Sequence, residues 1–349
     1  MSEEIGRTEL HELGEFGLIK HLTQGILYTH TATVKGVGDD AAILQAPTGL
    51  QTVITTDMLL EGIHFDLGYV PLKHLGYKCV AVNVSDVLAM NAQPAHITVG
   101  LALSNRFSVE ATEELYSGML AACRHYGIDL VGGDTTSSLS GMVISITAVG
   151  YAEPHMIATR SGAREGDLIL VSGNLGGAFA GLQVLEREKK VFTEAPGVQP
   201  DLGGYEYVLQ RQLKPEARQD ITTQLKELEI IPTAMIDISD GLASELLHIA
   251  DGSNVGVDVY EEKIPLHENT LATANDFGLN PITCALNGGE DYELLFTIKQ
   301  KDYDKAIQLH DVTIIGHVTA EGSESRLITR AGEGIALKAQ GWDTFNTNE

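Results

Sequence analysis

The chain has 349 residues, which is enough for two domains with separate hydrophobic cores. Hydrophobic residues make up 43% of it and charged residues 20%, as is ordinary for a soluble globular protein. The formal net charge of −25 argues against a nucleic-acid or anionic-membrane surface, because no basic field would attract such a partner.

Other features of the sequence indicate a cytoplasmic protein. The first residues, MSEEIGRTEL, are polar and acidic and do not form a signal peptide. No apolar run approaches the roughly 20 residues that span a bilayer. Cys79, Cys123 and Cys284 form no C-x-x-C pair, so we expect buried, inert thiols. The histidines show no H-E-x-x-H arrangement, so zinc is not expected.

The first half of the chain is predicted to be an α+β domain. Apolar spacing indicates helices within residues 8–29, 71–91 and 109–126, and strands at 41–44, 52–55, 95–103, from 130, and at 142–150. From residue 40 to 150 the predicted order is β-β-α-β-α-β-β. This order suits helices packed on one face of a sheet.

Acidic residues and hydroxyls follow the apolar segments of this half. Within residues 36–57, Gly38-Asp39-Asp40 and Thr55-Thr56-Asp57 are expected where a strand meets a loop. Hard oxygen ligands of this kind suit Mg²⁺, which usually shares its shell with water and phosphate. Because Asp and Gly also make ordinary turns, one such cluster alone is weak evidence.

A further carboxylate, Asp86, falls on the predicted helix 71–91. It lies three residues from Asn83, so the two side chains share one helix face, amid several valines. A carboxylate in such surroundings is unfavourable unless something pairs with it. A metal ion is one candidate partner, and a hydrogen bond within the helix or an exposed side chain is the alternative.

The second half is expected to form another domain, with 1–152 as the first and 153–349 as the second. Strands are predicted at 168–171, 294–298 and 312–319, with a further acidic strand end within 234–242, and helices at 178–189, 217–228 and 242–251. The Gly-rich turn 172–177 could bind an anion, although it is not a P-loop. Residues 190–207 are predicted to form a Pro/Gly-rich surface insertion or flexible loop. Arg160 is either a surface cation or a bidentate phosphate clamp.

Acidic clusters recur along both halves. Besides GDD and TTD there are GGD at 132–134, DISD at 237–240 and GGED at 288–291. No G-x-x-x-x-G-K-[ST] segment occurs in the chain. The set therefore points to a site that uses several Mg²⁺ ions to bind a nucleoside triphosphate, and we expect the distant aspartates to meet in one cavity.

These motifs, in this order, resemble the thiamine-monophosphate kinase family, of the superfamily that includes aminoimidazole ribonucleotide synthase. The matching segments are GEFGLI (14–19), GVGDDAA (36–42), TTDMLLEGIHF (55–65), KCVAVNVSDVLAM (78–90), LVGGDTT (130–136), TRSGA (159–163), DISDGL (237–242), GGEDYEL (288–294) and GWDTF (341–345). They span nearly the whole chain and are specific as a set. The insertion 190–207 and the segment 211–215 depart from the family pattern, which leaves their role open.

The resemblance implies an ATP-dependent kinase that converts thiamine monophosphate to thiamine diphosphate, with Mg²⁺, in the last step of thiamine diphosphate biosynthesis. It implies metal ligands at Asp40, Thr55, Thr56, Asp57, Asp86, Asp134, Asp237 and Asp240. ATP contacts are implied at Tyr116, Gly133, Asp134, Arg160 and Ser239. The thiamine end would meet His64, Glu290 and Trp342. Catalysis would rest on Asp57, Asp86, Asp134 and Arg160.

The resemblance also implies the architecture. The N-terminal α+β domain would bind ATP and Mg²⁺ and form a homodimer through its sheet, and the C-terminal α/β domain would close over the nucleotide. Two alternatives remain open, the purine cyclo-ligase of the same superfamily and a non-catalytic acidic metal-binding module. A selenophosphate synthetase would need a reactive Cys near the N-terminus, and none precedes Cys79. The hydrogenase-maturation relative would end in Cys, and this chain ends in Glu349.

Overall fold

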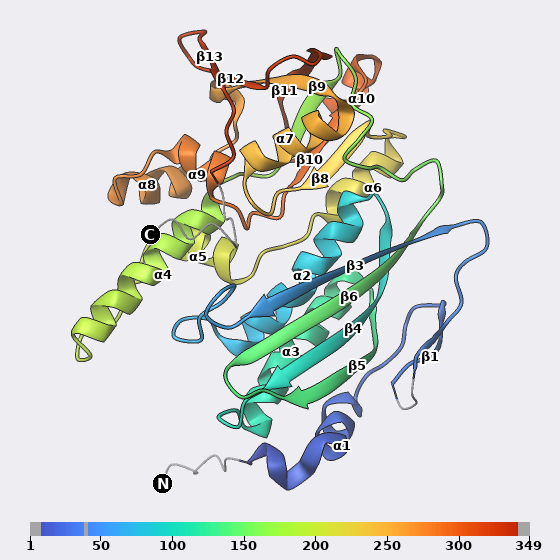
Figure 1. The fold of residues 1–349 in the computed structure, drawn as a ribbon, viewed down its shortest axis with the longest axis vertical. Coiled ribbons are helices and arrows are strands. Elements are labelled where there is room, and N and C mark those ends of the chain that lie inside the picture. The colour runs from blue at the N-terminus through green and yellow to red at the C-terminus, as the bar shows by residue number, and fades with distance from the viewer. Residues whose placement is uncertain (1–7, 38–40, 341–349) are drawn as a thin grey trace. The chain divides into compact units, whose positions relative to one another are not determined.

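The computed structural model describes residues 8–37 and 41–340 (Figure 1). The chain forms two compact units. Unit 1 contains the residues up to Val87 and Ala92–His155, and unit 2 contains Leu88–Asn91 and the residues from Met156 onward. Unit 1 ends near the expected boundary after residue 152, which itself stays a prediction.

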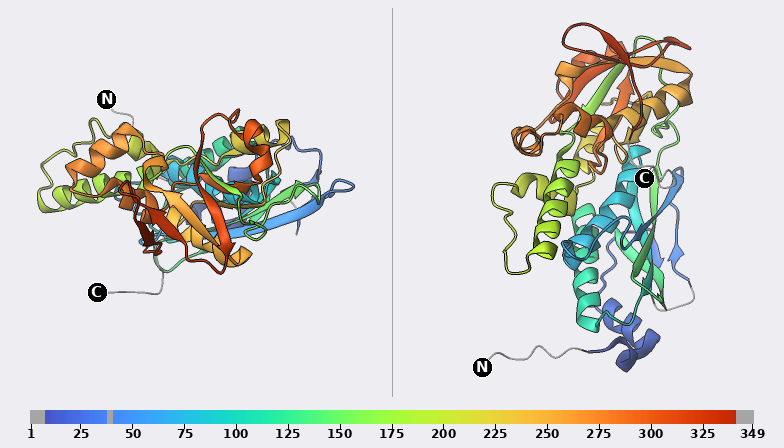
Figure 2. Two further views of the ribbon diagram at one scale, coloured as in Figure 1. Left: turned by 90° about the horizontal axis from the view of Figure 1, so that it is seen from above. Right: turned by 60° about the vertical axis from the view of Figure 1, so that its left-hand side comes forward.

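Unit 1 is built on a four-stranded sheet. The strand order is β3 (Gln51–Leu60), β6 (Met142–Ala152), β4 (Gln93–Leu103) and β5 (Asp129–Ser137). Only β4 and β5 are parallel to each other. Helices α2 (Leu72–Ala89) and α3 (Val109–Tyr126) cover one face of this sheet (Figure 2). On the opposite face Ile54 and Met58 are 66% and 54% exposed.

Helices α2 and α3 pack closely because glycines stand where they cross. A Cβ atom at Gly76 would lie 1.9 Å from the carbonyl oxygen of Leu115, and one at Gly118 would lie 2.0 Å from that of Lys73. Helix α3 begins at Ser108, whose Oγ accepts a hydrogen bond from the Ala111 N–H at 3.3 Å, as an N-cap serine does. The predicted bounds of this helix are confirmed.

The expectation that Thr55-Thr56-Asp57 ends a strand is wrong. Strand β3 continues to Leu60, and Asp57 pairs with Ile146 within the ladder to β6. The extension follows from packing, because the long β6 offers hydrogen-bond partners beyond Asp57 and Leu59 is buried. Strand β5 likewise runs through the GGD segment instead of stopping at it.

The N-terminal segments also differ from expectation. Helix α1 (Leu10–Thr23) is shorter than 8–29 and is interrupted at Gly14, which has a φ of 65°. Residues 41–44 do not join the main sheet. Instead, β1 (Thr33–Lys35) and β2 (Ile43–Leu44) form a small antiparallel sheet of their own.

Unit 2 contains a seven-stranded mixed sheet. In spatial order its strands are β13 (Gly334–Ala336), β12 (Arg326–Ile328), β9 (Val255–Tyr260), β11 (Val312–Glu321), β7 (Leu168–Ser172), β10 (Leu294–Ile298) and β8 (Ala234–Asp237). Its helices are α4 (Gly177–Glu194), α5 (Glu206–Leu213), α6 (Gln219–Glu227), α7 (Leu242–Ser253), α8 (Glu268–Asp276), α9 (Pro281–Asn287) and α10 (Tyr303–Ala306), with short 3₁₀ turns at Glu261–Lys263 and Gln300–Asp302. The predicted insertion 190–207 is therefore partly helical, because α4 extends to Glu194.

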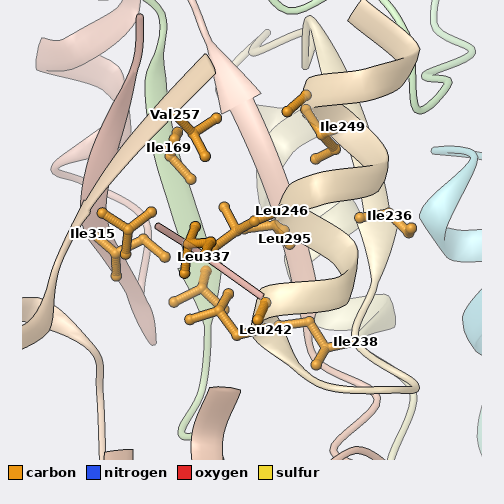
Figure 3. Close-up of a cluster of buried hydrophobic side chains, with 14 of the residues drawn as sticks. Ile169, Ile236, Ile238, Leu242, Leu246, Ile249, Val257, Leu295, Ile315 and Leu337 are labelled. Carbon is orange, nitrogen blue, oxygen red and sulfur yellow. The ribbon is translucent and has the colours of Figure 1, made fainter. Parts of the chain in front are cut away.

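Strands β7, β10 and β8 of the unit 2 sheet are buried on both faces. On one face α7 packs Leu242, Leu246 and Ile249 against strand residues that include Ile169 and Leu295 (Figure 3). On the other face the next strand residues pack against α6 and α10, in a cluster of Leu170, Ile221, Leu225, Met235, Phe296, Ala306 and Leu309. Burial on both faces explains why β7 and β10 read as unbroken apolar runs.

The three thiols lie where the sequence placed them. Cys79, Cys123 and Cys284 are buried and free. Burial raises the pKa of the Cys123 thiol to about 12 and also raises the pKa of Cys79, so these thiols stay protonated. No helix in the part of the chain that the structure describes has the length and apolar character needed to cross a membrane.

Candidate active site

Two acidic side chains of unit 1 face each other between β3 and α2. Thr55 donates a hydrogen bond from Oγ1 to Oδ2 of Asp86 at 2.6 Å. Two residues further along β3, the Asp57 N–H donates to Oδ1 of Asn83 at 3.0 Å. The strand period of two puts Thr55 and Asp57 on one face, and the helix spacing of three brings Asn83 and Asp86 opposite them. Asn83 also bonds within its helix, from Nδ2 to the Cys79 carbonyl oxygen at 2.9 Å.

The carboxylates of Asp57 and Asp86 are close enough to affect each other's ionisation. Burial, and then the negative charge of Asp86, raise the pKa of Asp57 from 3.8 to about 6. Both effects disfavour the ionised carboxylate, and a nearby cation would reverse them. The pair therefore has the electrostatic character of a cation site.

The donor set of this pair fits Mg²⁺. Two carboxylates and the hydroxyl of Thr55 are hard oxygen donors, and Mg²⁺ commonly binds one or two carboxylates together with water and phosphate. Within residues 8–37 and 41–340, no three His, Cys, Asp or Glu side chains are placed so that they could hold a metal ion together. Asp40 lies outside the described residues.

Asp134 lies on the other face of the same sheet. The register aligns Asp57 with Ile146, Ile146 with Val99, and Val99 with Gly133. Asp134 stands in the next row, so its side chain points to the face opposite that of Asp57. It is exposed there. The structure thus brings Asp57 and Asp86 together but does not place Asp134 beside them.

The other predicted residues of this sheet also lie on different faces, some on the helix-covered face and some on the open face. Thr135 is buried and hydrogen-bonds with Tyr116 of α3. Burial raises the pKa of Tyr116 to about 12, and only 7% of its surface is exposed. Tyr116 therefore lies in the helix–sheet interior. Thr56 is exposed on the open face and donates to the Ile146 carbonyl oxygen at 3.0 Å.

His64 lies in the turn that follows β3. Its Nδ1 accepts a hydrogen bond from the Leu60 N–H at 3.1 Å, and its side chain is exposed. The isolated bridge between Glu61 and Phe65 closes this turn. His64 is thus held by the backbone while its ring remains accessible.

In unit 2 the DISD segment joins β8 to α7. Asp237 is the last residue of β8 and is 5% exposed, so this segment is an acidic strand end, as predicted. The Asp240 N–H donates to Oε1 of Glu245 at 3.0 Å, and Ser239 Oγ lies 3.5 Å from the same oxygen. Three carboxyl groups thus gather at the start of α7.

Burial raises the pKa of Glu245 to about 8, and the charges of Asp240 and Asp237 act in the same direction. The Asp240 N–H opposes this rise by donating to the ionised form. Burial also raises the pKa of Asp240, while the charges of His248 and Arg160 lower it. The start of α7 therefore gathers carboxyl groups whose ionisation a cation or a cation-bridged phosphate would favour.

Arg160 lies in the loop before β7, close enough to act on the charge of Asp240. The loop is fastened to the end of α7 by Ser253, whose Oγ accepts from the N–H groups of Gly162 and Ala163, both at 3.1 Å. Gly162 has a φ of 131°, and a Cβ there would lie 2.3 Å from the Thr233 carbonyl oxygen. Glycine is therefore required for this path.

The GGED segment joins the same region. The Glu290 N–H donates to the Ser239 carbonyl oxygen at 2.7 Å, so the segment expected to meet the thiamine end touches the one expected to meet ATP. Asp291 is fully buried, and its carboxylate accepts from the N–H groups of Gly176 at 2.6 Å and Ala178 at 3.2 Å. The anion at the start of α4 is thus supplied by the chain itself, which removes the Gly-rich turn as a phosphate site.

Comparison with known proteins identifies the family. Two family models match, AIR synthase related protein, N-terminal domain, over residues 38–152, and AIR synthase related protein, C-terminal domain, over residues 164–328. Thiamine-monophosphate kinase of Bacillus subtilis is 32% identical over 339 residues, which cover 95% of this chain and all of that protein. The chain belongs to the thiamine-monophosphate kinase family. Thiamine-monophosphate kinase of Aquifex aeolicus is 36% identical over 337 residues, covering 96% of this chain and 99% of the relative.

A solved structure of the thiamine-monophosphate kinase family has the same fold. AaThiL complexed with AMPPCP and TMP is 35% identical, with a TM-score of 0.73, over 97% of this chain and 99% of that one. The expected fold class, an α+β domain followed by an α/β domain, is confirmed. The expected enzyme class, a phosphotransferase with a phosphate group as acceptor, is confirmed as well.

Three residues that contact the predicted site segments were not themselves predicted from the sequence. Glu245 and Ser253 lie on α7, and Gln212 lies on α5, where its amide contacts Glu290. A carboxylate among the apolar residues of α7 is a sequence signal of the kind that singled out Asp86. Ser253 and Gln212 act through contacts that join distant segments, so spacing along the chain gives no sign of them. Trp342 lies outside the described residues.

Proposed function

We propose that this chain transfers the γ-phosphoryl group of ATP directly to thiamine monophosphate, forming thiamine diphosphate. The observation that supports this proposal most strongly is the alignment of nearly the whole chain with thiamine-monophosphate kinases, at 32% and 36% identity. AaThiL, which has the same fold, was solved with an ATP analogue and TMP together. The reaction is the last step of thiamine diphosphate biosynthesis, and we place it in the cytoplasm.

The proposed chemistry needs no catalytic base. The attacking atom is an oxygen of a phosphate monoester, whose second pKa is about 6, so it is largely deprotonated at neutral pH. The difficulty is repulsion between two anions. At 4 Å and an effective dielectric near 20, two unit charges repel by about 4 kcal/mol. The protein must therefore align donor and acceptor and offset their charge.

Thr55, Asp57 and Asp86 would hold one Mg²⁺ in unit 1, because their oxygens and disturbed charges fit a cation. Asp237 and Asp240 would bind Mg²⁺ at the start of α7. Asp40, Thr56 and Asp134 remain proposed ligands. Bound Mg²⁺ would neutralise phosphate charge as the γ-phosphoryl group moves.

The remaining contacts are assigned to the two substrates. Arg160 would clamp a phosphate of ATP, since its loop is fastened beside Asp240. The ATP contacts would otherwise come from Gly133, Asp134 and Ser239, whereas Tyr116, buried between helix and sheet, is not proposed as one. The thiamine end would meet His64, Glu290 and Trp342. A homodimer through the open face of the unit 1 sheet is also proposed, since Ile54 and Met58 are exposed on it.

The test compares acceptors under identical conditions. The wild-type chain is incubated with ATP and Mg²⁺, with either thiamine monophosphate or the ring-closing substrate of aminoimidazole ribonucleotide synthase. We expect thiamine diphosphate from the first and no ring closure from the second. ATP consumption only with the second substrate would show that the chain is the cyclo-ligase and not the kinase. Metal binding with no turnover of either would favour a non-catalytic module.

A further inference from the structure

Helix α5 contacts the Glu290 carboxylate through a residue for which no role was predicted from the sequence. Gln212, the seventh residue of this helix, donates from Nε2 to Oε2 of Glu290 at 3.0 Å. The Tyr292 hydroxyl donates to the other oxygen, Oε1, at 3.4 Å. Gln212 is 8% exposed. Both oxygens of Glu290 thus contact neutral donors from two different segments.

The same helix holds the backbone on which Glu290 stands. Arg211 donates from Nη2 to the Asp291 carbonyl oxygen at 2.9 Å, and its Nη1 lies 2.9 Å from Oε1 of Glu293. Arg211 also donates to the Asn174 carbonyl oxygen at 3.3 Å. Consecutive residues of α5 therefore fix the main chain and the side chain of the GGED segment.

The segment needs such support because of its conformation. Glu290 has a φ of 61° and Tyr292 a φ of 51°, in the left-handed region that residues other than glycine rarely adopt. Such backbone persists only when its surroundings determine it, and it concentrates at binding sites. The Glu290 N–H is held by the Ser239 carbonyl oxygen and the Tyr292 N–H by that of Ile238, at 2.7 and 2.9 Å.

We propose that Gln212 is a positioning residue that fixes the Glu290 carboxylate for the thiamine end of the acceptor. The inference rests on the proposed function. A neutral amide donor holds the carboxylate without adding a positive charge, whereas an arginine in the same place would add one. A carboxylate held in a fixed position suits the cationic thiazolium ring of thiamine monophosphate. Fixing it before binding also removes the entropy loss of ordering a free side chain.

The test uses two substitutions at Gln212 and one matched control. Gln212→Ala removes the donor. Gln212→Glu keeps the size of the side chain but turns the donor into an acceptor facing Glu290. Gln210→Ala makes the same truncation two residues away on α5, where the side chain is exposed. KM for thiamine monophosphate, KM for ATP, kcat and the melting temperature are measured for all three and for the wild type.

We expect Gln212→Ala to raise KM for thiamine monophosphate about tenfold, in keeping with loss of a hydrogen bond to a charged group. KM for ATP and the melting temperature should stay close to those of Gln210→Ala. Gln212→Glu should raise KM for thiamine monophosphate further, because two carboxylates then repel. If Gln212→Ala does not fold, the comparison of Gln212→Glu with the wild type decides.

Several results would overturn the inference. One is a KM for thiamine monophosphate within twofold of the Gln210→Ala value in both Gln212 variants. Another is near-normal behaviour of Gln212→Glu, which would mean that only the volume of Gln212 matters. Parallel changes in both KM values and in stability would indicate a structural role alone. Failure of the wild type to form thiamine diphosphate would instead refute the proposed function, so the two failures are distinguishable.

Discussion

Thr55 and Asp86 are joined by a hydrogen bond of 2.6 Å from Oγ1 to Oδ2, between a strand and the helix that covers it. The bond turns the Asp86 carboxylate toward the face of β3 that carries Asp57. The two acids come from positions 29 residues apart in sequence (86 − 57) and still disturb each other, since the charge of Asp86 contributes to the raised pKa of Asp57. A cation bound between the two carboxylates would relieve this repulsion.

Asp57→Asn is expected to lower kcat by about a thousandfold or more, because an amide oxygen is a weaker Mg²⁺ ligand than a carboxylate. The fold should persist, since the substitution removes a repulsive charge from a partly buried place. The measurement is kcat with thiamine monophosphate, together with a thermal unfolding curve. Asp304→Asn, at an exposed position, is the control. A wild-type rate in Asp57→Asn would remove this residue from the metal site.

Glu245 makes the metal-free protein sensitive to pH. Burial raises its pKa from 4.5 to about 8, so between these values the folded chain binds more protons than the unfolded chain. Its contribution to stability is complete below about pH 4.5 and is lost as the pH rises toward 8. In EDTA, Glu245→Gln should therefore gain about 2 kcal/mol in free energy of unfolding over the wild type at pH 8, and much less at pH 5. Urea unfolding measures this difference, and a gain that does not change with pH would contradict the assignment.

Ser253→Ala should weaken ATP binding through the loop that carries Arg160. The substitution removes an acceptor shared by the N–H groups of Gly162 and Ala163. We expect KM for ATP to rise severalfold while KM for thiamine monophosphate changes little. Ser323→Ala, in an exposed turn, is the matched control. Equal kinetics for the two variants would show that Ser253 does not position Arg160.

Gly118→Ala should destabilise unit 1. The added methyl would meet the Lys73 carbonyl oxygen at 2.0 Å, so α2 and α3 would have to separate, at a loss of about 3 kcal/mol in free energy of unfolding. Gly25→Ala is the comparison, since a Cβ there meets nothing within 4 Å. Denaturant unfolding compares the two, and an equal effect would argue against close packing of these helices.

Elements whose local signals agree with their packing were predictable from the sequence. Helix α3 has the expected bounds because a capping serine begins it and an apolar face follows. Strand β10 has the expected bounds because it is buried on both faces. The polar stretch in β3 was misread as a strand end, since the pairing with β6 that continues the strand involves residues about 90 positions away.

Only the local part of the candidate site was predictable from the sequence. The spacing of Asn83 and Asp86 revealed their shared face, and the structure shows what they face. The position of Asp134 on the opposite face depends on the register of four strands, which no local pattern encodes. The occupation of the α4 N-terminus by Asp291 joins residues 115 apart, so the Gly-rich turn alone looked like an open anion site.

Transfer of the γ-phosphoryl group is tested most directly by following the label from [γ-³²P]ATP. The wild-type chain is mixed with labelled ATP and thiamine monophosphate, with Mg²⁺ or with EDTA. Direct, Mg²⁺-dependent transfer predicts labelled thiamine diphosphate with Mg²⁺ and none with EDTA. Absence of label from thiamine diphosphate in Mg²⁺, or equal labelling in EDTA, would contradict it.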